Sequence, residues 1–421
     1  MSVQQKEVLI IGGGNAGLSA AAQIKNRDSK LQVTVIDPAE YHYYQPAWTL
    51  VGAGTYDAEK TKRRQADVIP NGVEWIQEAA ETFEPEKNLV HTKNGKSYTY
   101  KYLIVCPGIQ LNWGDIKGLK ENLGKNGVCS NYKYDMAQYT WECLKSFKGG
   151  NALFTQPATP IKCGGAPQKI MYLAEDYLQN NKLRSSSEVA FFTPGGVIFG
   201  VEVFANVLKK VIKRKDIKVK FKHELVEIDG EEKIAYFKVD QDTPSITTID
   251  DAENKLKAQR TEDGLLAVPF DMIHVTPPQS APDFIKNSPL ADPESPFGWV
   301  EVDPKTLQHK RFENIFSLGD AGSMPNAKTG AAIRKQAPVL VENLFKVMQK
   351  DEMKNPAAYD GYGSCPLVTG YGKMVLAEFN YDNEPTPSLP IDTAKERWSM
   401  WILKKYVLPW LYWNKILKGK A

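Results

Sequence analysis

Two short segments of this chain place a cysteine among glycine and proline, the residues that most often build tight loops. Cys163 stands in Ile-Lys-Cys-Gly-Gly-Ala-Pro at 161–167, and Cys365 stands in Gly-Ser-Cys-Pro at 363–366. An accessible thiolate is both a nucleophile and a redox group. Two distant loop thiols therefore indicate redox chemistry on sulfur, provided that a redox cofactor binds beside them.

The residues around Cys163 favour its thiolate form. A helix is expected directly after Gly165, with Pro167 near its first position, where proline is favoured. Cys163 would then precede a helix N-terminus, with Lys162 beside it and Lys169 in the first turns. Positive charge and the helix dipole both lower the pKa of a neighbouring thiol. We therefore expect Cys163 to be a nucleophile.

Cys365 is expected in a second loop, ahead of a strand. Pro366 biases the residue before it towards an extended conformation, which helps to fix the direction of the thiol. The alternative for both loop cysteines is that they are small buried side chains, as free cysteines commonly are. We expect Cys106 and Cys143 to be of this buried kind, and the assignment of Cys129 stays open.

The composition excludes several classes of protein. A chain of 421 residues is too long for one hydrophobic core, so two or more domains are expected. The net charge of +3 is too small to favour nucleic acid as a partner. No apolar run is long enough to span a membrane, and no export signal is expected, because the first strand starts by Lys6. The 5 cysteines lack the spacing of a disulfide framework, and the 5 scattered histidines predict no metal site.

The N-terminal segment predicts a dinucleotide-binding unit. A strand is expected at 7–11, a helix at 18–26 and a second strand at 31–36. The glycines between the first strand and the helix fit the G-x-G-x-x-G pattern, which lets a pyrophosphate approach the backbone and the helix N-terminus. The acid after the second strand would accept a hydrogen bond from the ribose. The predicted cofactor contacts of this unit are Gly12, Gly14, Asn15, Ala16, Gly17 and Asp37.

Two later strands indicate that the dinucleotide is FAD. Residues 312–320 predict a strand that ends in Gly319 and Asp320, and residues 102–108 predict one that ends in Cys-Pro-Gly at Gly108. These segments resemble motifs of the flavoproteins with two dinucleotide-binding domains, where the Gly-Asp pair closes over the ribityl chain and pyrophosphate of FAD. The middle motif departs from the Thr-Gly of those proteins and loses a hydroxyl. The order of the three motifs implies an FAD domain that is split in sequence.

The inserted region begins another strand–turn–helix unit, but the turn is degenerate. After a predicted strand at 188–193, glycines fall at 195, 196 and 200, so the G-x-G-x-x-G pattern is missing. The next strand, at 217–221, ends in Lys222 and His223 rather than in an acid. We interpret this region as a Rossmann-like domain that no longer binds nicotinamide, with a divergent NADH site as the alternative.

These patterns predict an α/β protein with two Rossmann-like dinucleotide-binding domains and a C-terminal membrane-interface helical region. The FAD domain takes residues 1–115 and 269–350, and the degenerate domain takes residues 116–268. The C-terminal region takes residues 351–421 and carries the Cys365 loop.

The segment 394–418 combines tryptophan and leucine with lysine. This composition is typical of a helix that lies in the membrane interface, and the segment is too charged to span a bilayer. Pro409 is expected to split it into two short helices. A membrane-facing end would give access to a lipid-soluble electron acceptor such as a quinone. The alternative is a helix packed on the core or at a contact between copies of a homo-oligomer.

Three segments together resemble sulfide:quinone oxidoreductase, in particular the type that includes the mitochondrial enzymes. They are residues 320–332, the Cys163 loop and residues 364–371. The resemblance implies bound FAD, oxidation of hydrogen sulfide through a cysteine pair that carries persulfide or trisulfide sulfur, and transfer of two electrons to a membrane quinone. Cys163 matches the family's cysteine next to the flavin, and Cys365 matches the partner that receives the sulfide sulfur. Some relatives need a third cysteine near the position of Cys129.

The resemblance also implies partners and further site residues. A small-molecule sulfur acceptor is implied, and so is the surface of the mitochondrial inner membrane or of a bacterial cytoplasmic membrane. Lys328 and the helix that starts near Thr329 would stabilise negative charge on the reduced flavin, with a solvated loop lysine as the alternative. By analogy with the family, Gln45, Ala80 and Gly330 contact FAD.

Two other functions stay open on the residues alone. A type II NADH:quinone dehydrogenase shares the fold and the membrane habit, but it needs a working nicotinamide site. A flavin redox sensor would carry cysteines that report the redox state without turnover.

Overall fold

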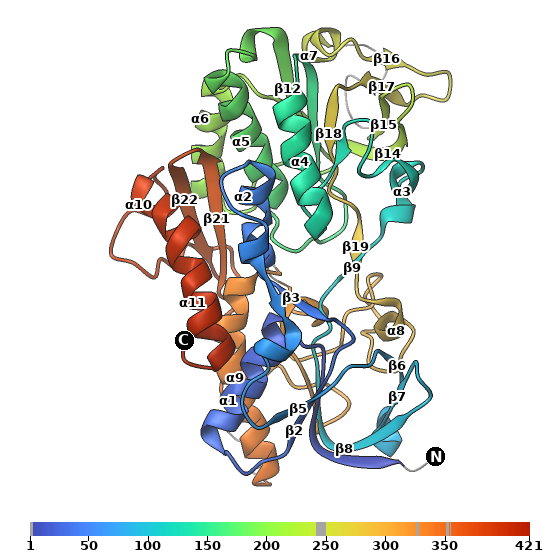
Figure 1. The fold of residues 1–421 in the computed structure, drawn as a ribbon, viewed down its shortest axis with the longest axis vertical. Helices are drawn as coiled ribbons and strands as arrows, with labels where there is room; N and C mark the ends of the chain where they lie inside the picture. The colour runs from blue at the N-terminus through green and yellow to red at the C-terminus, as the bar shows by residue number, and fades with distance from the viewer. Residues whose placement is uncertain (1–2, 241–249, 326–327, 351–352, 354) are drawn as a thin grey trace.

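The computed structural model describes residues 3–240, 250–325, 328–350, 353 and 355–421. The chain forms two lobes, each with a mainly parallel sheet, and a C-terminal hairpin and helix lie along their side (Figure 1). The predicted α/β class with two Rossmann-like units and a C-terminal helical region is therefore confirmed. The division of the chain at residues 115, 268 and 350 stays a prediction.

The sheet of the first lobe takes strands from both ends of the chain. Its order is β5-β2-β1-β8-β7-β6, and β20 pairs in parallel with β8. The apolar run of β1 is buried on both faces, as a central parallel strand requires. Because β20 follows the inserted region, this sheet is split in sequence. Its strands are β1 (Gln4–Ile11), β2 (Val33–Ile36), β5 (Val73–Ile76), β6 (Ala80–Glu84), β7 (Leu89–Thr92), β8 (Ser97–Val105) and β20 (Ile315–Ser317).

Two long helices of the first lobe meet at the carboxyl edge of this sheet. The helix α1 (Asn15–Arg27) follows β1, and α9 (Gly330–Met348) packs against α1. Their N-termini adjoin, because Asn15 Nδ2 donates a hydrogen bond to the Gly330 carbonyl oxygen at 3.4 Å. Shorter elements of this lobe are β3 (Tyr41–Tyr43), β4 (Lys62–Arg64) and α8 (Asp283–Lys286), whereas α2 (Trp48–Gly52) packs against the helices α4 (Tyr134–Ser146) and α5 (Ala166–Asn180) of the second lobe.

The second lobe contains a parallel sheet and a smaller antiparallel one. The parallel order is β10-β18-β11-β12-β13, and the antiparallel order is β14-β15-β17-β16. The parallel strands are β10 (Val128–Cys129), β11 (Gly150–Thr155), β12 (Ser187–Thr193), β13 (Lys218–Phe221) and β18 (Met272–His274). The antiparallel strands are β14 (His223–Asp229), β15 (Ile234–Val239), β16 (Gln259–Arg260) and β17 (Leu266–Pro269). The helices are α3 (Leu119–Asn122), α4 (Tyr134–Ser146), α5 (Ala166–Asn180), α6 (Glu202–Arg214) and α7 (Asp251–Lys255). Between the lobes, β9 (Gln110–Leu111) pairs with β19 (Gln279–Ser280).

A C-terminal hairpin carries the second cysteine and corrects one prediction. Cys365 is expected in a loop, but it lies in β21 (Gly363–Gly370) and pairs with Ala377 of β22 (Lys373–Phe379). Glycine and proline suggest a loop at this position. Among the described strands, however, β21 pairs with β22 alone, and such an edge strand tolerates Pro366.

The C-terminal helix is continuous, so the prediction that Pro409 splits it is wrong. It runs through α10 (Trp398–Ile402), a π-helical turn (Leu403–Val407) and α11 (Leu408–Asn414), followed by a short turn (Ile416–Lys418). Proline interrupts an α-helix because it lacks an N–H and clashes with the preceding turn. Here Pro409 stands at the start of α11, directly after the wider π turn, where both effects are relieved.

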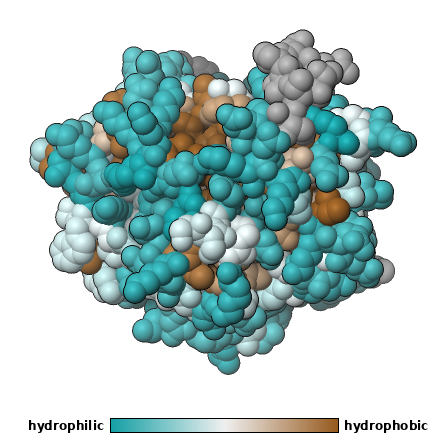
Figure 2. Space-filling view, turned by 90° about the horizontal axis from the view of Figure 1, so that it is seen from above, coloured by the Kyte–Doolittle hydropathy of each residue, from teal (hydrophilic) through white to brown (hydrophobic). Residues whose placement is uncertain are grey.

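The aromatic residues of this helix divide between core and surface. Trp398 and Trp410 are 68% and 54% exposed, whereas Trp401 and Trp413 are buried. The alternative that this helix packs on the core therefore holds for Trp401 and Trp413, and Trp398 and Trp410 face outward. Among the described residues, no helix is long and apolar enough to cross a bilayer. The face at the upper end of the molecule is mostly hydrophilic, with small hydrophobic patches (Figure 2).

Candidate functional site

The two cysteines that the sequence selects meet in the structure. Their Sγ atoms are 3.6 Å apart, although the two residues are far apart in the sequence. Cys163 lies in the loop before α5, and Cys365 lies in the strand β21. The N–H of Cys163 donates a hydrogen bond to the Lys328 carbonyl oxygen at 2.8 Å, and this holds the cysteine in a left-handed conformation with φ of 54°. Gly165 permits the approach, because a Cβ there would lie 2.6 Å from Cys365 Sγ.

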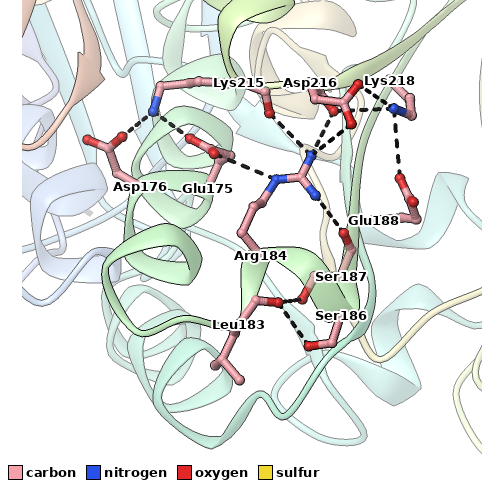
Figure 3. Close-up of polar contacts among 10 residues, drawn as sticks. All are labelled: Glu175, Asp176, Leu183, Arg184, Ser186, Ser187, Glu188, Lys215, Asp216 and Lys218. Atoms are coloured by element: carbon pink, nitrogen blue, oxygen red, sulfur yellow. Dashed lines mark hydrogen bonds and ion pairs between the residues drawn. The ribbon is translucent and has the colours of Figure 1, made fainter.

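A buried ion-pair network fixes the helix behind the first cysteine against the hairpin that carries the second. Near the C-terminal end of α5, Asp176 accepts a hydrogen bond from the Lys215 ammonium group (Figure 3). The other carboxylate oxygen of Asp176 accepts a hydrogen bond from Tyr371 N–H at 2.7 Å, in the turn between β21 and β22. The polar groups drawn in Figure 3 belong to Glu175, Asp176, Leu183, Arg184, Ser186, Ser187, Glu188, Lys215, Asp216 and Lys218.

Two lysines bring positive charge to the sulfur pair. Lys169 Nζ donates a hydrogen bond to Cys163 Sγ at 3.0 Å, and Lys404 Nζ donates one to the Pro46 carbonyl oxygen at 2.8 Å. Hydrogen bonding from the Cys365 thiol, then the charge of Lys169, holds the pKa of Cys163 well below its usual range. The same contact with Cys163, together with burial, raises the pKa of Cys365 well above its usual range. The surroundings of the pair therefore favour the thiolate form at Cys163 rather than at Cys365.

Lys404 is buried, although the sequence groups it with the lysines of the expected membrane-interface segment. In the sequence it is one of several lysines of an amphipathic segment, whereas in the structure it is 3% exposed. Burial, and then the charge of Lys169, lowers the pKa of Lys404 to about 7. Lys404 lies in the π-helical turn. Because this turn has more residues than an α-helical turn, the 3.6-residue periodicity of an α-helix does not predict that Lys404 points inward.

The other three cysteines lie in the core. Cys106 and Cys143 are buried, as expected, and the thiol of Cys106 donates a hydrogen bond to the Gly12 carbonyl oxygen at 3.7 Å. Cys129, whose assignment is open in the sequence, is also buried, with its thiol 3.5 Å from the Ile273 carbonyl oxygen. Burial raises the pKa of Cys129, which makes it a poor nucleophile.

The first glycine turn has the close packing and the open space that a dinucleotide needs. Gly12 has a φ of 105°, and a Cβ there would lie 2.5 Å from the Cys106 carbonyl oxygen. A Cβ at Gly17 would lie 1.9 Å from the Gly12 carbonyl oxygen, so α1 packs directly on the turn. A Cβ at Gly14 would meet none of the described atoms within 4 Å. Gly14 precedes α1, and this open side at a helix N-terminus suits a pyrophosphate.

Asp37 lies next to the same turn. Its carboxylate accepts hydrogen bonds from Gly13 N–H at 2.5 Å and from Ala39 N–H at 2.7 Å. Burial raises the pKa of Asp37, and these two bonds oppose the shift. The side chain is therefore held in a fixed direction at the end of β2, where a ribose would lie.

The Gly-Asp motif and the segment after it close the other side of the turn. Gly319, with a φ of 74°, lies so close to Ala16 that a Cβ on the glycine would be 3.0 Å from the alanine Cβ. Lys328 Nζ donates hydrogen bonds to the carbonyl oxygens of Asp320 at 2.9 Å and Gly322 at 2.8 Å. Burial lowers the pKa of Lys328 to about 8, against the opposing charge of Asp320. Lys328 is therefore buried, and the alternative of a solvated loop lysine is wrong.

Thr329 caps the N-terminus of α9 as expected, because its hydroxyl oxygen accepts a hydrogen bond from Ala332 N–H at 3.3 Å.

The remaining predicted cofactor contacts lie at different distances from the cysteine loop. Next to that loop, Gln45 Oε1 accepts a hydrogen bond from Lys162 Nζ at 2.6 Å. A Cβ at Gly108 would meet none of the described atoms within 4 Å. Ala80 starts β6, at the edge of the first sheet, opposite Thr92. Gln45 thus adjoins the cysteine loop, whereas Ala80 lies on an outer strand.

The second glycine turn differs from the first. No Cβ added at Gly195, Gly196 or Gly200 would come closer than 3.5 Å to a described atom, so the turn lacks the tight backbone packing seen at Gly12. Directly after β13, Lys222 stands where an acid would bind a ribose, and its Nζ lies 3.4 Å from Asp240 Oδ2. In the described part of the chain, no group of three or more His, Cys, Asp or Glu side chains could hold a metal ion.

Comparisons with known proteins extend over nearly the whole chain. A family model described as pyridine nucleotide-disulphide oxidoreductase matches residues 6–137. The mitochondrial sulfide:quinone oxidoreductase of Dictyostelium discoideum is 44% identical over 416 residues, which cover 98% of this chain and 86% of the relative. The mitochondrial sulfide:quinone oxidoreductase of Mus musculus is 42% identical over 413 residues, with 98% and 86% covered.

A solved structure has a similar fold. The X-ray structure of the sulfide:quinone oxidoreductase from Aquifex aeolicus matches with a TM-score of 0.78 and 19% identity, covering 99% of this chain and 92% of that one. At this identity the match shows the fold. The mitochondrial relatives, by contrast, share enough sequence to show the family, and the resemblance inferred from the sequence is confirmed. The chain belongs to the sulfide:quinone oxidoreductase family of flavin-dependent enzymes.

Proposed function

We propose that this protein oxidises hydrogen sulfide with FAD and passes two electrons to a membrane quinone, using Cys163 and Cys365 as its redox pair. The observation that carries the proposal is the 3.6 Å separation of the two sulfur atoms. A direct disulfide bond is about 2.05 Å long, and one interposed sulfur atom would hold the outer sulfurs about 3.3 Å apart. The two free thiols are therefore close enough to form a direct disulfide bond or to hold one sulfur atom between them. The activity named for the Dictyostelium and mouse relatives supports the same reaction.

The glycine turn and its surroundings fit FAD. The open sides of Gly14 and Gly108, where a Cβ would meet none of the described atoms within 4 Å, are places that a cofactor can fill. When bound, the flavin supplies a two-electron acceptor beside the sulfur pair. The residues that we propose to hold it are Gly12, Gly14, Asn15, Ala16, Gly17, Asp37, Gln45, Ala80, Gly108, Gly319, Asp320, Lys328, Thr329 and Gly330.

The side chains of the pair have separate roles in this proposal. In the oxidised protein, taken as a direct disulfide, hydrosulfide bonds to Cys365 Sγ and the bond between the two cysteine sulfurs breaks. The proton stays on the incoming sulfur, which becomes a persulfide on Cys365. The electron pair of the broken bond leaves on Cys163 as a thiolate. Lys169, 3.0 Å from that sulfur, stabilises the negative charge. A small-molecule acceptor would then take the outer sulfur and leave a thiolate on Cys365. Re-forming the bond between the two cysteine sulfurs would release the two electrons that the flavin accepts.

The outward side of the C-terminal helix supports a membrane location for the quinone reaction. Trp398, Tyr406 and Trp410 are exposed, and Lys405 lies beside them on the same helix. Exposed aromatic rings with neighbouring lysines suit the interface of a bilayer. We therefore place the protein on the surface of the mitochondrial inner membrane or of a bacterial cytoplasmic membrane, as a peripheral protein.

Anaerobic reduction of the purified, flavin-loaded protein tests this function. Sulfide is expected to bleach the flavin absorbance, and added quinone is expected to restore it, because the cysteine pair delivers two electrons. NADH is expected to leave the flavin oxidised, because the second glycine turn lacks the G-x-G-x-x-G pattern. Bleaching by NADH and not by sulfide would identify a type II NADH dehydrogenase instead. Bleaching by sulfide without quinone-dependent turnover would identify a redox sensor.

A further inference from the structure

The carboxyl edge of the second parallel sheet ends beside the first cysteine loop. Here β11 and β18 lie next to each other, and the strand order reverses between them. In open parallel sheets, ligands bind in the crevice at such a point. Thr155 ends β11 and Thr276 follows β18, and Thr276 N–H donates a hydrogen bond to Thr155 Oγ1 at 3.4 Å. The neighbouring strand β10 leads into Asn131 and Tyr132.

Buried polar atoms without a hydrogen-bond partner gather at this edge. Among the described residues they include Nδ2 and Oδ1 of Asn131, Nδ1 of His274, Oγ1 of Thr276 and Nε2 of Gln279. These four residues are between 0% and 8% exposed. Buried polar groups in native proteins nearly always bond to protein, to ordered water or to a ligand. The edge therefore needs an occupant.

Most of these atoms are hydrogen-bond donors. Asn131 N–H donates to His274 Nε2 at 2.9 Å, so that ring nitrogen carries no proton. Burial lowers the pKa of His274 to about 3, so the ring is neutral and its proton lies on Nδ1. The amide nitrogens of Asn131 and Gln279 and the hydroxyl of Thr276 are donors as well. A group that accepts several hydrogen bonds, above all a small anion, matches this set.

The residues around these donors contact the backbone of Lys162, the residue before Cys163. Tyr132 Oη donates a hydrogen bond to the Lys162 carbonyl oxygen at 3.4 Å, and Lys162 N–H donates one to Gln279 Oε1 at 2.9 Å. Burial raises the pKa of Tyr132 and negative charge on Cys163 adds to the shift, while the Thr276 hydroxyl beside it opposes the shift, so the Tyr132 hydroxyl lies within electrostatic reach of the first cysteine. An anion held here is next to the cysteine that precedes α5.

We propose that Asn131, His274, Thr276 and Gln279 form a small-anion site that binds hydrosulfide immediately before it reaches the cysteine pair. The proposal rests on the function proposed above and adds where its sulfur substrate binds. The site takes a small ligand, because its members are nearly fully buried. The positive charges of the lysines around the first cysteine favour an anion over neutral hydrogen sulfide. A small oxyanion that serves as sulfur acceptor would accept the same hydrogen bonds. The experiment below distinguishes binding of hydrosulfide from binding of that acceptor.

The test measures anaerobic flavin reduction of the holoenzyme as a function of sulfide concentration. Thr276→Val keeps the shape and removes one donor, so the apparent Kd for sulfide is expected to rise about tenfold or more, with little change in the limiting rate. Asn131→Asp replaces a donor by a negative charge and is expected to weaken sulfide binding further. Thr140→Val is the matched control, because Thr140 is also fully buried but donates to the Met136 carbonyl oxygen within α4. The control should keep the wild-type Kd.

Each other outcome decides against the site. An unchanged apparent Kd for sulfide in folded Thr276→Val and Asn131→Asp proteins, with normal flavin bleaching, overturns the inference and leaves the proposed function intact. A wild-type protein that sulfide does not reduce refutes the proposed function itself. An unchanged Kd for sulfide with a raised KM for sulfite assigns the residues to the sulfur acceptor and overturns the hydrosulfide assignment.

A crystal of the holoenzyme soaked in bromide gives an independent readout. The expected result is an anomalous peak within hydrogen-bond distance of Thr276 Oγ1 and Asn131 Nδ2. Ordered water alone at these atoms, with bromide bound elsewhere, would show that the donors are satisfied by solvent, and the site would not exist as proposed.

Discussion

Replacement of Cys163 by serine is expected to lower the rate of flavin reduction by sulfide about a thousandfold or more. Serine has nearly the same shape, but an alkoxide is a far poorer leaving group than a thiolate, and a hydroxyl cannot form a bond to the partner sulfur under these conditions. We propose this role for Cys163 because its pKa is held well below the usual range by the Cys365 thiol and by Lys169. Stopped-flow absorbance under anaerobic conditions measures the rate.

The matched control for that variant is Cys143→Ser. Cys143 is buried in α4 and takes no part in the proposed pair, so the control protein should be reduced at close to the wild-type rate. Loss of activity in both variants would point to general instability of the fold. Near-normal reduction of the Cys163→Ser protein would refute the role of the cysteine pair.

Lys169→Met is expected to lower flavin reduction by sulfide about 10- to 100-fold, because a charge-assisted hydrogen bond to the thiolate is lost. Methionine fills a similar volume, and Lys169 is buried with its Nζ 3.0 Å from Cys163 Sγ, so the main change is electrostatic. Loss of the positive charge raises the pKa of Cys163. The thiolate is the form present above that pKa, so the variant loses reactivity first at acidic pH, and its profile moves to higher pH.

Alkylation of Cys163 by iodoacetamide across a pH series measures this shift directly, with peptide mass spectrometry to locate the label. Lys405→Met is the control, because Lys405 bonds to Thr55 Oγ1 at 2.8 Å and lies outside the sulfur pair. The control should alkylate with the wild-type profile. An unchanged profile in the Lys169→Met protein would show that Lys169 does not stabilise the thiolate.

The sequence predicts those features of the molecule that a short run of neighbouring residues determines, such as the glycine turn and the starts of helices. The glycine turn at Gly12 and Gly17 needs positive φ or direct backbone contact, which leaves little choice of residue. Thr329 caps the helix that follows it, and Cys163 precedes a helix with proline in its first turn. Each of these features arises within a few residues along the chain, so the pattern carries the information.

The features that the sequence misses depend on contacts between distant segments. Cys365 looks like a loop residue by its neighbours, yet pairing with Ala377 makes it part of a strand. Lys404 looks like a surface lysine, yet the π turn directs it towards Pro46 and the sulfur pair. Trp413 looks like an interfacial residue, yet it packs beside the ring of His42 in the core. Local composition cannot separate these cases, because burial is decided by the partner element.

The most direct measurement of the central claim is to follow isotopically labelled sulfur into the protein. The oxidised holoenzyme is mixed anaerobically with one equivalent of ³⁴S-labelled sulfide, quenched with an alkylating reagent and digested for peptide mass spectrometry. The account predicts labelled persulfide on Cys365 and an alkylated thiol on Cys163 in samples quenched before the flavin is reduced, because these two products already take up both electrons of the broken disulfide bond. Flavin reduction without labelled sulfur on Cys365, or with the label on Cys163 alone, would contradict it.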